Sequence, residues 1–238
     1  MNEDDELRIP SHCYNDRDAL ASVLADTVAD RLNAALGQRE RVSLVVSGGN
    51  TPIPFFEALR TRDLAWDRIT VTLADERWVG TDHEASNEAL VRTHLLQDKA
   101  AKASFVSLVN DADDPISGEL RVHEALAAVS RPFDVVILGS GGDGHTASLF
   151  PHAEELPAAL DRSQPALCRG IYGSKEPRAR LTLTRRALLE SRWIAIHVTG
   201  TDKWDALVKA DAGHDERAMP IRTILHQHEV PVDVYWAP

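Results

Sequence analysis

The stretch FDVVILGSGGDGHTASLFP, residues 133–151, joins an apolar segment to a glycine-rich loop. Apart from Asp134, residues 133–138 are apolar and rich in β-branched side chains, which predicts a buried strand. Gly139, Gly141 and Gly144 then spell G-x-G-x-x-G, the pattern of dinucleotide-binding loops. Such a loop opens a helix of several turns, and Pro151 would interrupt a helix here. The pattern therefore disfavours a dinucleotide site.

The same loop carries Asp143 and His145 at its tip. Glycine-rich backbone can approach a ligand closely and present N–H groups to a negative charge. A histidine in this position can act as a general base near neutral pH, and an adjacent aspartate can orient its ring. Two interpretations remain: a purely structural glycine turn, and a catalytic loop in which His145 and Asp143 work as a pair.

Outward from this loop, short apolar strands alternate with helical stretches. Strands are predicted at residues 42–46, 69–74, 103–108, 133–138, 180–184, 193–198 and 232–236. Helices are predicted at 16–37, in the later part of 115–129, within 199–210 and at 220–225. Three more are predicted to begin at Pro52, near Ser86 and after residue 184, and Thr51 would cap the one at Pro52. This alternation is typical of an α/β fold with a doubly wound, mostly parallel sheet and helices on both faces. We expect one α/β domain over residues 1–238, with residues 1–10 as a flexible tail.

Three polar loops directly follow predicted strands: SGGNTP (47–52), ADER (74–77) and GSGGDGH (139–145). Because ligands bind at the carboxyl ends of parallel strands, we expect these loops to share one site. The first loop offers free N–H groups before a helix, which suits a phosphate, although a simple strand-to-helix turn is the alternative. Three cations near strand ends would suit an anionic sugar. The predicted substrate-binding residues are Ser47, Gly48, Gly49, Asn50, Thr51, Asp75, Arg77, Gly142, Ser148, Arg180 and Lys203.

Composition excludes several other classes of function. The formal net charge of −11 argues against non-specific nucleic-acid binding, which depends on lysine and arginine. Apolar runs are far shorter than the roughly 20 residues of a membrane helix, and the acidic N-terminus does not resemble a signal peptide. Cys13 and Cys168 lack metal-binding spacing and fit a reducing cytoplasm, and a single disulfide between them is the alternative. We expect no metal and no organic cofactor.

These motifs together resemble the 6-phosphogluconolactonase family, which lies within a larger group that includes glucosamine-6-phosphate deaminases. The resemblance rests on VVSGGNTP (45–52), DERWV (75–79), SNEALVRTHLL (86–96), residues 133–151, RLTLT (180–184) and VTGTDKW (198–204). The chain departs from the family pattern at His152, where glycine is usual, at Trp204, where alanine is usual, and in PIRTI near Met219.

The resemblance implies a NagB/RpiA-like fold, with a possible small additional α/β subregion, and a cytoplasmic enzyme that is a monomer or weak homodimer. It implies hydrolysis of 6-phospho-D-glucono-1,5-lactone to 6-phospho-D-gluconate in the oxidative pentose phosphate pathway. In that chemistry His145 activates water, Asp143 orients its ring, and Arg77 assists the loop N–H groups at the oxyanion. Ser47, Gly48, Gly49 and Thr51 would hold the 6-phosphate, with Arg180 and Lys203 as its cationic partners.

Two alternatives stay open. A glucosamine-6-phosphate deaminase/isomerase would share these loops, but it normally has a further acidic residue just after the histidine loop. Here Glu154 and Glu155 follow only after Pro151. A non-catalytic sugar-phosphate sensor would need an attached DNA-binding module, for which this acidic chain has no spare residues.

Overall fold

A seven-stranded sheet forms the centre of the molecule in the computed structural model, which describes residues 7–238. The strand order is β1-β10-β9-β6-β2-β3-β5, and all neighbouring strands run parallel. The strands are β1 (Ser11–Cys13), β2 (Val42–Val46), β3 (Ile69–Leu73), β5 (Ser104–Val106), β6 (Val135–Leu138), β9 (Ile194–Thr199) and β10 (Val232–Ala237). This order puts β6 between β2 and β9, so the loops that follow these three strands begin side by side.

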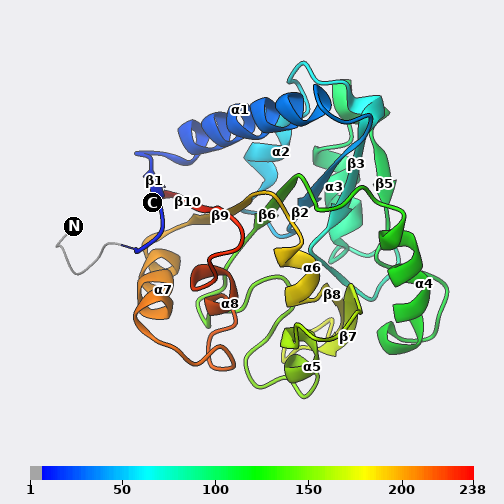
Figure 1. The fold of residues 1–238 in the computed structure, drawn as a ribbon, viewed down its shortest axis with the longest axis vertical. Coiled ribbons are helices and arrows are strands. Elements are labelled where there is room, and N and C mark those ends of the chain that lie inside the picture. The colour runs from blue at the N-terminus through cyan, green and yellow to red at the C-terminus, as the bar shows by residue number, and fades with distance from the viewer. Residues whose placement is uncertain (1–6) are drawn as a thin grey trace.

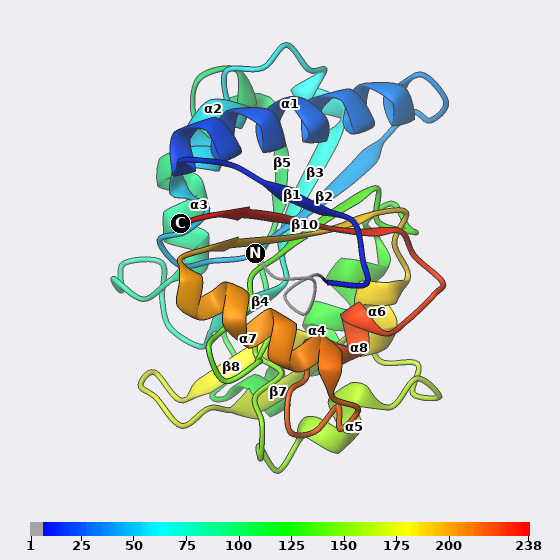
Figure 2. The ribbon, with the colours of Figure 1, turned by 90° about the vertical axis from the view of Figure 1, so that its left-hand side faces the viewer.

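Helices cover both faces of the large sheet (Figures 1 and 2), which confirms the predicted fold class. In Figure 2, α1 and α2 lie on one side of the sheet, and α6, α7 and α8 lie on the other. The helices are α1 (Arg17–Leu36), α2 (Ile53–Leu59), α3 (Asn87–His94), α4 (Pro115–Ala127), α5 (Leu156–Leu160), α6 (Arg185–Leu189), α7 (Thr201–Ala212) and α8 (Arg222–Leu225). Single 3₁₀ turns occur at Trp66–Arg68 and Asp98–Lys102.

Helix α1 forms where its sequence pattern predicts it. The Asp16 side chain accepts a hydrogen bond from the Ala19 N–H and caps the first turn, and Gly37 follows the last turn. Leucine and valine residues three or four positions apart form one fully buried face: Leu20, Leu24, Val28 and Leu32. This face packs on α2 and on the central strands of the sheet.

A second, antiparallel sheet of order β4-β8-β7 lies beyond the large one. Its strands are β4 (Asp75–Arg77), β8 (Ala179–Leu183) and β7 (Cys168–Tyr172). Strand β4 begins two residues after β3 ends, so the chain passes directly from one sheet to the other. Residues 75–77, which the sequence predicts as a loop, are therefore a short strand, and their side chains are fixed by pairing with β8.

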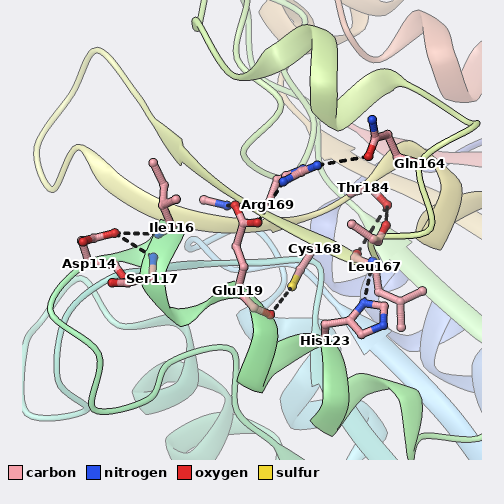
Figure 3. A network of polar contacts seen from close by, with 12 residues as sticks. Asp114, Ile116, Ser117, Glu119, His123, Gln164, Leu167, Cys168, Arg169 and Thr184 are labelled. Atoms are coloured by element: carbon pink, nitrogen blue, oxygen red, sulfur yellow. Dashed lines mark hydrogen bonds and ion pairs between the residues drawn. The ribbon is translucent and has the colours of Figure 1, made fainter.

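Helix α4 braces the small sheet through a polar network (Figure 3). The Glu119 carboxylate accepts a hydrogen bond from the Gly170 N–H at 2.8 Å and forms an ion pair with Arg169 at 3.0 Å. One helical turn further on, His123 Nδ1 accepts from the Leu167 N–H at 3.2 Å. These contacts hold β7, and through it the neighbouring strand β8, against the body of the protein.

Other expectations need correction at the level of single elements. Thr51 does not cap α2: the cap position is Pro52, which makes no side-chain hydrogen bond. Helix α4 begins at Pro115 and not only in the later part of 115–129. The Asp114 side chain caps it by accepting hydrogen bonds from the N–H groups of Ile116 and Ser117. The sequence gives no indication of β1, β7 or α5, which are three to five residues long.

The predicted flexible tail at residues 1–10 is also corrected in part. Residues 1–6 lie outside the described part of the chain. Leu7 and Ile9 pack against the core, and the backbone N–H of Arg8 donates to the Asp211 carboxylate at 3.0 Å. The Pro10 carbonyl accepts from Val234, so residues 7–10 lead into strand β1 as packed structure.

The close packing of α4 on β7 predicts that Gly170→Ala lowers the free energy of unfolding by about 1–3 kcal/mol. A Cβ on Gly170 would lie 2.8 Å from the Ile116 nitrogen and 2.9 Å from the Pro115 carbonyl carbon, and backbone cannot rotate away. Urea unfolding followed by circular dichroism measures the loss.

Gly37→Ala is the matched control, because Gly37 has φ −67° and its Cβ would have no neighbour closer than 3.4 Å. We expect this variant to change stability by less than about 0.5 kcal/mol. Equal losses in the two variants would contradict the close approach of α4 to β7.

Candidate functional site

A cavity of about 320 Å³ lies where β2, β6 and β9 end, and β4 and β8 close its other side. It brings together residues from all three predicted loops. Ten of the predicted site residues line it: Ser47, Gly48, Gly49, Asn50, Thr51, Asp75, Arg77, His145, Arg180 and Lys203. The expectation that the strand-end loops share one site is therefore supported by their positions.

The His145 ring is fixed by a short contact with Asp143. Nδ1 of His145 lies 2.5 Å from Oδ1 of Asp143, which also accepts the backbone N–H of His145 at 3.1 Å. The hydrogen bond from His145 lowers the pKa of Asp143 to about 2, so the carboxyl group is ionised at any working pH. Phe150 packs against the imidazole with ring centroids 5.0 Å apart. The side chain of His145 is about one-third exposed, and the ring borders the cavity.

Glycines in the histidine loop make room for this arrangement. The imidazole lies on the Cα of Gly141, where a Cβ would be 2.2 Å from Cε1 of His145. Gly144 has φ +77°, in the left-handed region that glycine adopts at least cost, and its Cα faces Met219. The loop closes on itself, because the Gly141 N–H donates to the His145 carbonyl at 2.9 Å. These glycines act by close packing and loop closure, and no pyrophosphate is needed to explain them.

The first loop presents a row of free donors. Within residues 7–238, the backbone N–H groups of residues 48–51 donate to no other group. Gly49 has φ +85°, which glycine adopts readily, and all four residues line the cavity. Since α2 has only seven residues, the donors belong to the loop and not to a long helix dipole. Such a row of N–H groups suits a phosphate.

Two arginines lie next to each other on adjacent strands of the small sheet. Arg77 and Arg180 are register partners in β4 and β8, and both line the cavity. Arg180 is 8% exposed, and its guanidinium lies 5.3 Å over the Phe150 ring. Burial and the charge of Arg77 both lower the pKa of Arg180. The charges of Asp75 and Glu76 act in the opposite direction and offset part of the repulsion between the arginines. Two guanidinium groups beside one cavity also suit an anion.

Three predicted residues do not border the cavity. Asp143 acts through His145, as described above. Ser148 is buried, and its hydroxyl donates to Oδ2 of Asp75 at 2.5 Å, so it positions a residue that does line the cavity. Gly142 is exposed at the loop tip and touches nothing in the site. His152, where the resembled family usually has glycine, adopts φ +64°, the conformation that glycine favours.

Four side chains of the site were missed in the sequence: Ser140, Asn87 and His197, which line the cavity, and Glu76 behind it. Glu76 is fully buried and accepts the N–H groups of Asn87 and Glu88 at 2.8 and 2.6 Å, so it fixes the start of α3. Burial raises the pKa of Glu76 to about 6, against the lowering effect of these hydrogen bonds. Asn87 then lies over Gly48, where a Cβ would be 1.9 Å from its Oδ1. The motif SNEALVRTHLL, on which the family resemblance partly rests, contains Asn87 and could have indicated it as a site residue. Only the fold shows that Asn87 contacts the loop at Gly48.

The site offers no clear place for a metal ion. Across residues 7–238, no group of three or more His, Cys, Asp or Glu side chains is arranged to hold one. In the same part of the chain, every helix is too short or too polar to cross a bilayer.

Comparisons with known proteins point to one group. The family model for glucosamine-6-phosphate isomerases/6-phosphogluconolactonase matches residues 15–236. A 6-phosphogluconolactonase of Pseudomonas putida is 42% identical over 237 residues, 98% of this chain and 96% of its own. One from Rhizobium meliloti is 42% identical over 232 residues, 95% and 98% of the two chains. The crystal structure of a 6-phosphogluconolactonase from Shewanella baltica superposes with a TM-score of 0.95 at 42% identity, covering 97% of this chain and 98% of that one.

The packing of His145 on Gly141 predicts that Gly141→Ala breaks the His145–Asp143 contact. A new Cβ would occupy the place of the imidazole edge, so the ring must move. The pKa of Asp143 should then rise from about 2 toward its ordinary value, because the hydrogen bond from His145 that lowers it is lost. Carbon NMR of the Asp143 carboxyl group during a pH titration measures this.

Gly142→Ala is the control in the same loop, because a Cβ there has no heavy atom within 4 Å. It should leave the pKa of Asp143 where it is. An unchanged value in Gly141→Ala would show that the glycine does not set the ring position.

Proposed function

Because the chain belongs to the glucosamine-6-phosphate isomerase/6-phosphogluconolactonase family, we propose that it hydrolyses 6-phospho-D-glucono-1,5-lactone to 6-phospho-D-gluconate. It would thereby act in the oxidative pentose phosphate pathway. The observation that carries the proposal is the single cavity that contains both His145 and the free N–H groups of residues 48–51. One end of that cavity suits a water-activating base, and the other suits a phosphate.

His145 acts as the general base. Asp143 engages Nδ1, which leaves Nε2 to take a proton from a water molecule. The water oxygen bonds to C1 of the lactone, and the carbonyl becomes a tetrahedral oxyanion. When this intermediate collapses, the bond from C1 to the ring oxygen O5 breaks, and the proton held at Nε2 passes to O5. The Asp143 carboxylate holds the ring and offsets the charge of the transient imidazolium.

The two arginines belong at the lactone end of the cavity. Arg180 lies over Phe150, the same ring that packs against His145, and Arg77 faces Arg180 across the small sheet. From this position their guanidinium groups stabilise the oxyanion. The resemblance alone grouped Arg180 with the phosphate ligands, and the shared contact with Phe150 favours the lactone end instead.

The 6-phosphate occupies the other end. Residues 48–51 supply N–H donors, Ser47 supplies a hydroxyl, and Lys203 supplies the positive charge. The phosphate does not react, so its binding energy positions C1 beside His145. Lys203 stands in the first turn of α7, directly after β9, where the chain turns at Gly200 with φ +93°.

Deaminase chemistry is the less suitable reading of the same cavity. Asp75 is the one carboxylate among the described residues that line it, and Ser148 already occupies one of its oxygens. Glu154 and Glu155 border a neighbouring cavity of about 430 Å³ and not this one. Release of ammonia from glucosamine 6-phosphate, in preference to lactone hydrolysis, would decide for the deaminase.

The mechanism predicts that His145→Ala lowers kcat by a factor of about 100 or more, because proton transfer by a positioned side chain contributes about that much. The assay follows acid release from freshly made 6-phosphogluconolactone, corrected for spontaneous ring opening. His152→Ala is the control, because His152 lies outside this cavity. Turnover near the wild-type rate in His145→Ala would remove this residue from the mechanism.

The assignment of the phosphate predicts that Lys203→Ala raises KM for 6-phosphogluconolactone about tenfold or more and changes kcat little. A lost ion pair to a bound phosphate weakens binding without touching the reacting carbon. Lys209→Ala is the matched control, because Lys209 lies on the same helix but outside the cavity. An unchanged KM in Lys203→Ala would place the phosphate elsewhere.

A further inference from the structure

A second histidine of the cavity has no part in the mechanism above. His197 lies in β9, its side chain is 3% exposed, and its ring forms part of the cavity wall. Leu138 of β6 is in register with Ile196, so Gly139 and His197 are the next residues of two adjacent strands. A Cβ on Gly139 would meet only the Ser47 hydroxyl, at 3.9 Å. The missing side chain leaves space between His197 and the first loop.

The polar atoms of this ring are unused. Within residues 7–238, neither Nδ1 nor Nε2 of His197 has a hydrogen-bond partner. A buried polar group without a partner is costly, and most such groups in native proteins are paired. The contact with Phe55, edge to face at 6.1 Å between centroids, would serve a purely apolar ring equally well. An imidazole in this place is therefore explained by a ligand and not by packing.

The surroundings define what that ligand is. Burial, followed by the positive charge of Lys203, lowers the pKa of His197 to about 4, so the ring is neutral at pH 7. A neutral imidazole has one N–H donor and one acceptor. The lysine and the free N–H groups of residues 48–51 border the same cavity, which suits an anion with several oxygen acceptors.

We propose that His197 donates a hydrogen bond from its ring N–H to an oxygen of the substrate's phosphate group. This inference rests on the proposed function, because it takes the phosphate to lie at the Lys203 end of the cavity. His197 adds a donor without adding charge, so it favours a phosphate monoester over an unphosphorylated sugar lactone. It is a specificity-determining residue, and it has no role in the proton transfers at C1 and O5.

The test compares His197→Phe with His197→Gln. Phenylalanine keeps the packing against Phe55 and removes the donor, whereas glutamine keeps an N–H donor. For His197→Phe, we expect KM for 6-phosphogluconolactone to rise about tenfold, with kcat within about twofold. For His197→Gln, the rise should be less than about threefold. A loss that is equal for 6-phosphogluconolactone and for unphosphorylated gluconolactone would show a packing role and overturn the proposal.

Direct binding separates this inference from the proposed function. Calorimetry with 6-phosphogluconate and with inorganic phosphate is run on wild type, His197→Phe and Lys203→Ala. Weaker binding in both variants supports the proposal. Weaker binding in Lys203→Ala alone overturns the role of His197 and leaves the phosphate site standing. Unchanged binding in both overturns the phosphate site as well.

The wild-type protein provides a measurement that does not depend on folding of the variants. Nitrogen NMR of the histidine rings is recorded while inorganic phosphate is added. The His197 resonances should shift on saturation, because a new hydrogen bond forms at one ring nitrogen. If they stay unshifted while the backbone N–H signals of residues 48–51 move, phosphate binds without His197 and the proposal fails.

Discussion

The position of β6 between β2 and β9 is the constraint on which the site depends. Parallel strands in register end at the same level, so the loops that follow them must meet. The loop after β2 brings N–H donors, the loop after β6 brings His145, and the turn after β9 brings Lys203. None of these groups lies near another in the sequence. If β6 slipped by one residue, its side chains would exchange faces, and the histidine loop would start from the wrong side of the sheet.

The small sheet supplies what the large one cannot. Parallel strands deliver loops to one end of the sheet, but they leave that end open to solvent. Strands β4 and β8 close it by placing Arg77 and Arg180 opposite each other. Helix α4, through Glu119 and β7, contributes to holding the small sheet in place, and the charges of Asp75 and Glu76 offset part of the repulsion between the two arginines. Strand pairing thus fixes two cations beside the cavity, which is the electrostatic preorganisation that the proposed function needs for an anion.

The sequence predicts the large sheet well, apart from the exposed edge strand β1, because its central strands are buried on both faces and form short apolar runs. The predicted strand at 42–46 has the same bounds as β2. The prediction is weaker for the small sheet, whose strands have three to five residues. The predicted strand at 180–184 matches β8 within one residue, whereas β7 is not predicted and Asp75–Arg77 looks like a loop because its side chains are charged. The same limit applies to the site. His145 and residues 47–51 stand in glycine-rich loops, whose composition is itself a signal. Glu76 and Asn87 act only through long-range contacts with α3 and Gly48, which no local pattern encodes.

In the proposed mechanism, their different environments give His145 and His197 two different tasks. A general base must accept a proton, which a neighbouring carboxylate favours, and it needs access for water. His145 has Asp143 at 2.5 Å and a side chain about one-third exposed. His197 is enclosed, has Lys203 as its nearby charge, and has a pKa lowered to about 4. An imidazole in that setting resists protonation and can offer only its existing N–H. Burial and the charge of Lys203 therefore exclude His197 from the proton transfers and also make its ring a suitable neutral donor. The division of roles follows from burial and charge rather than from distance to the substrate.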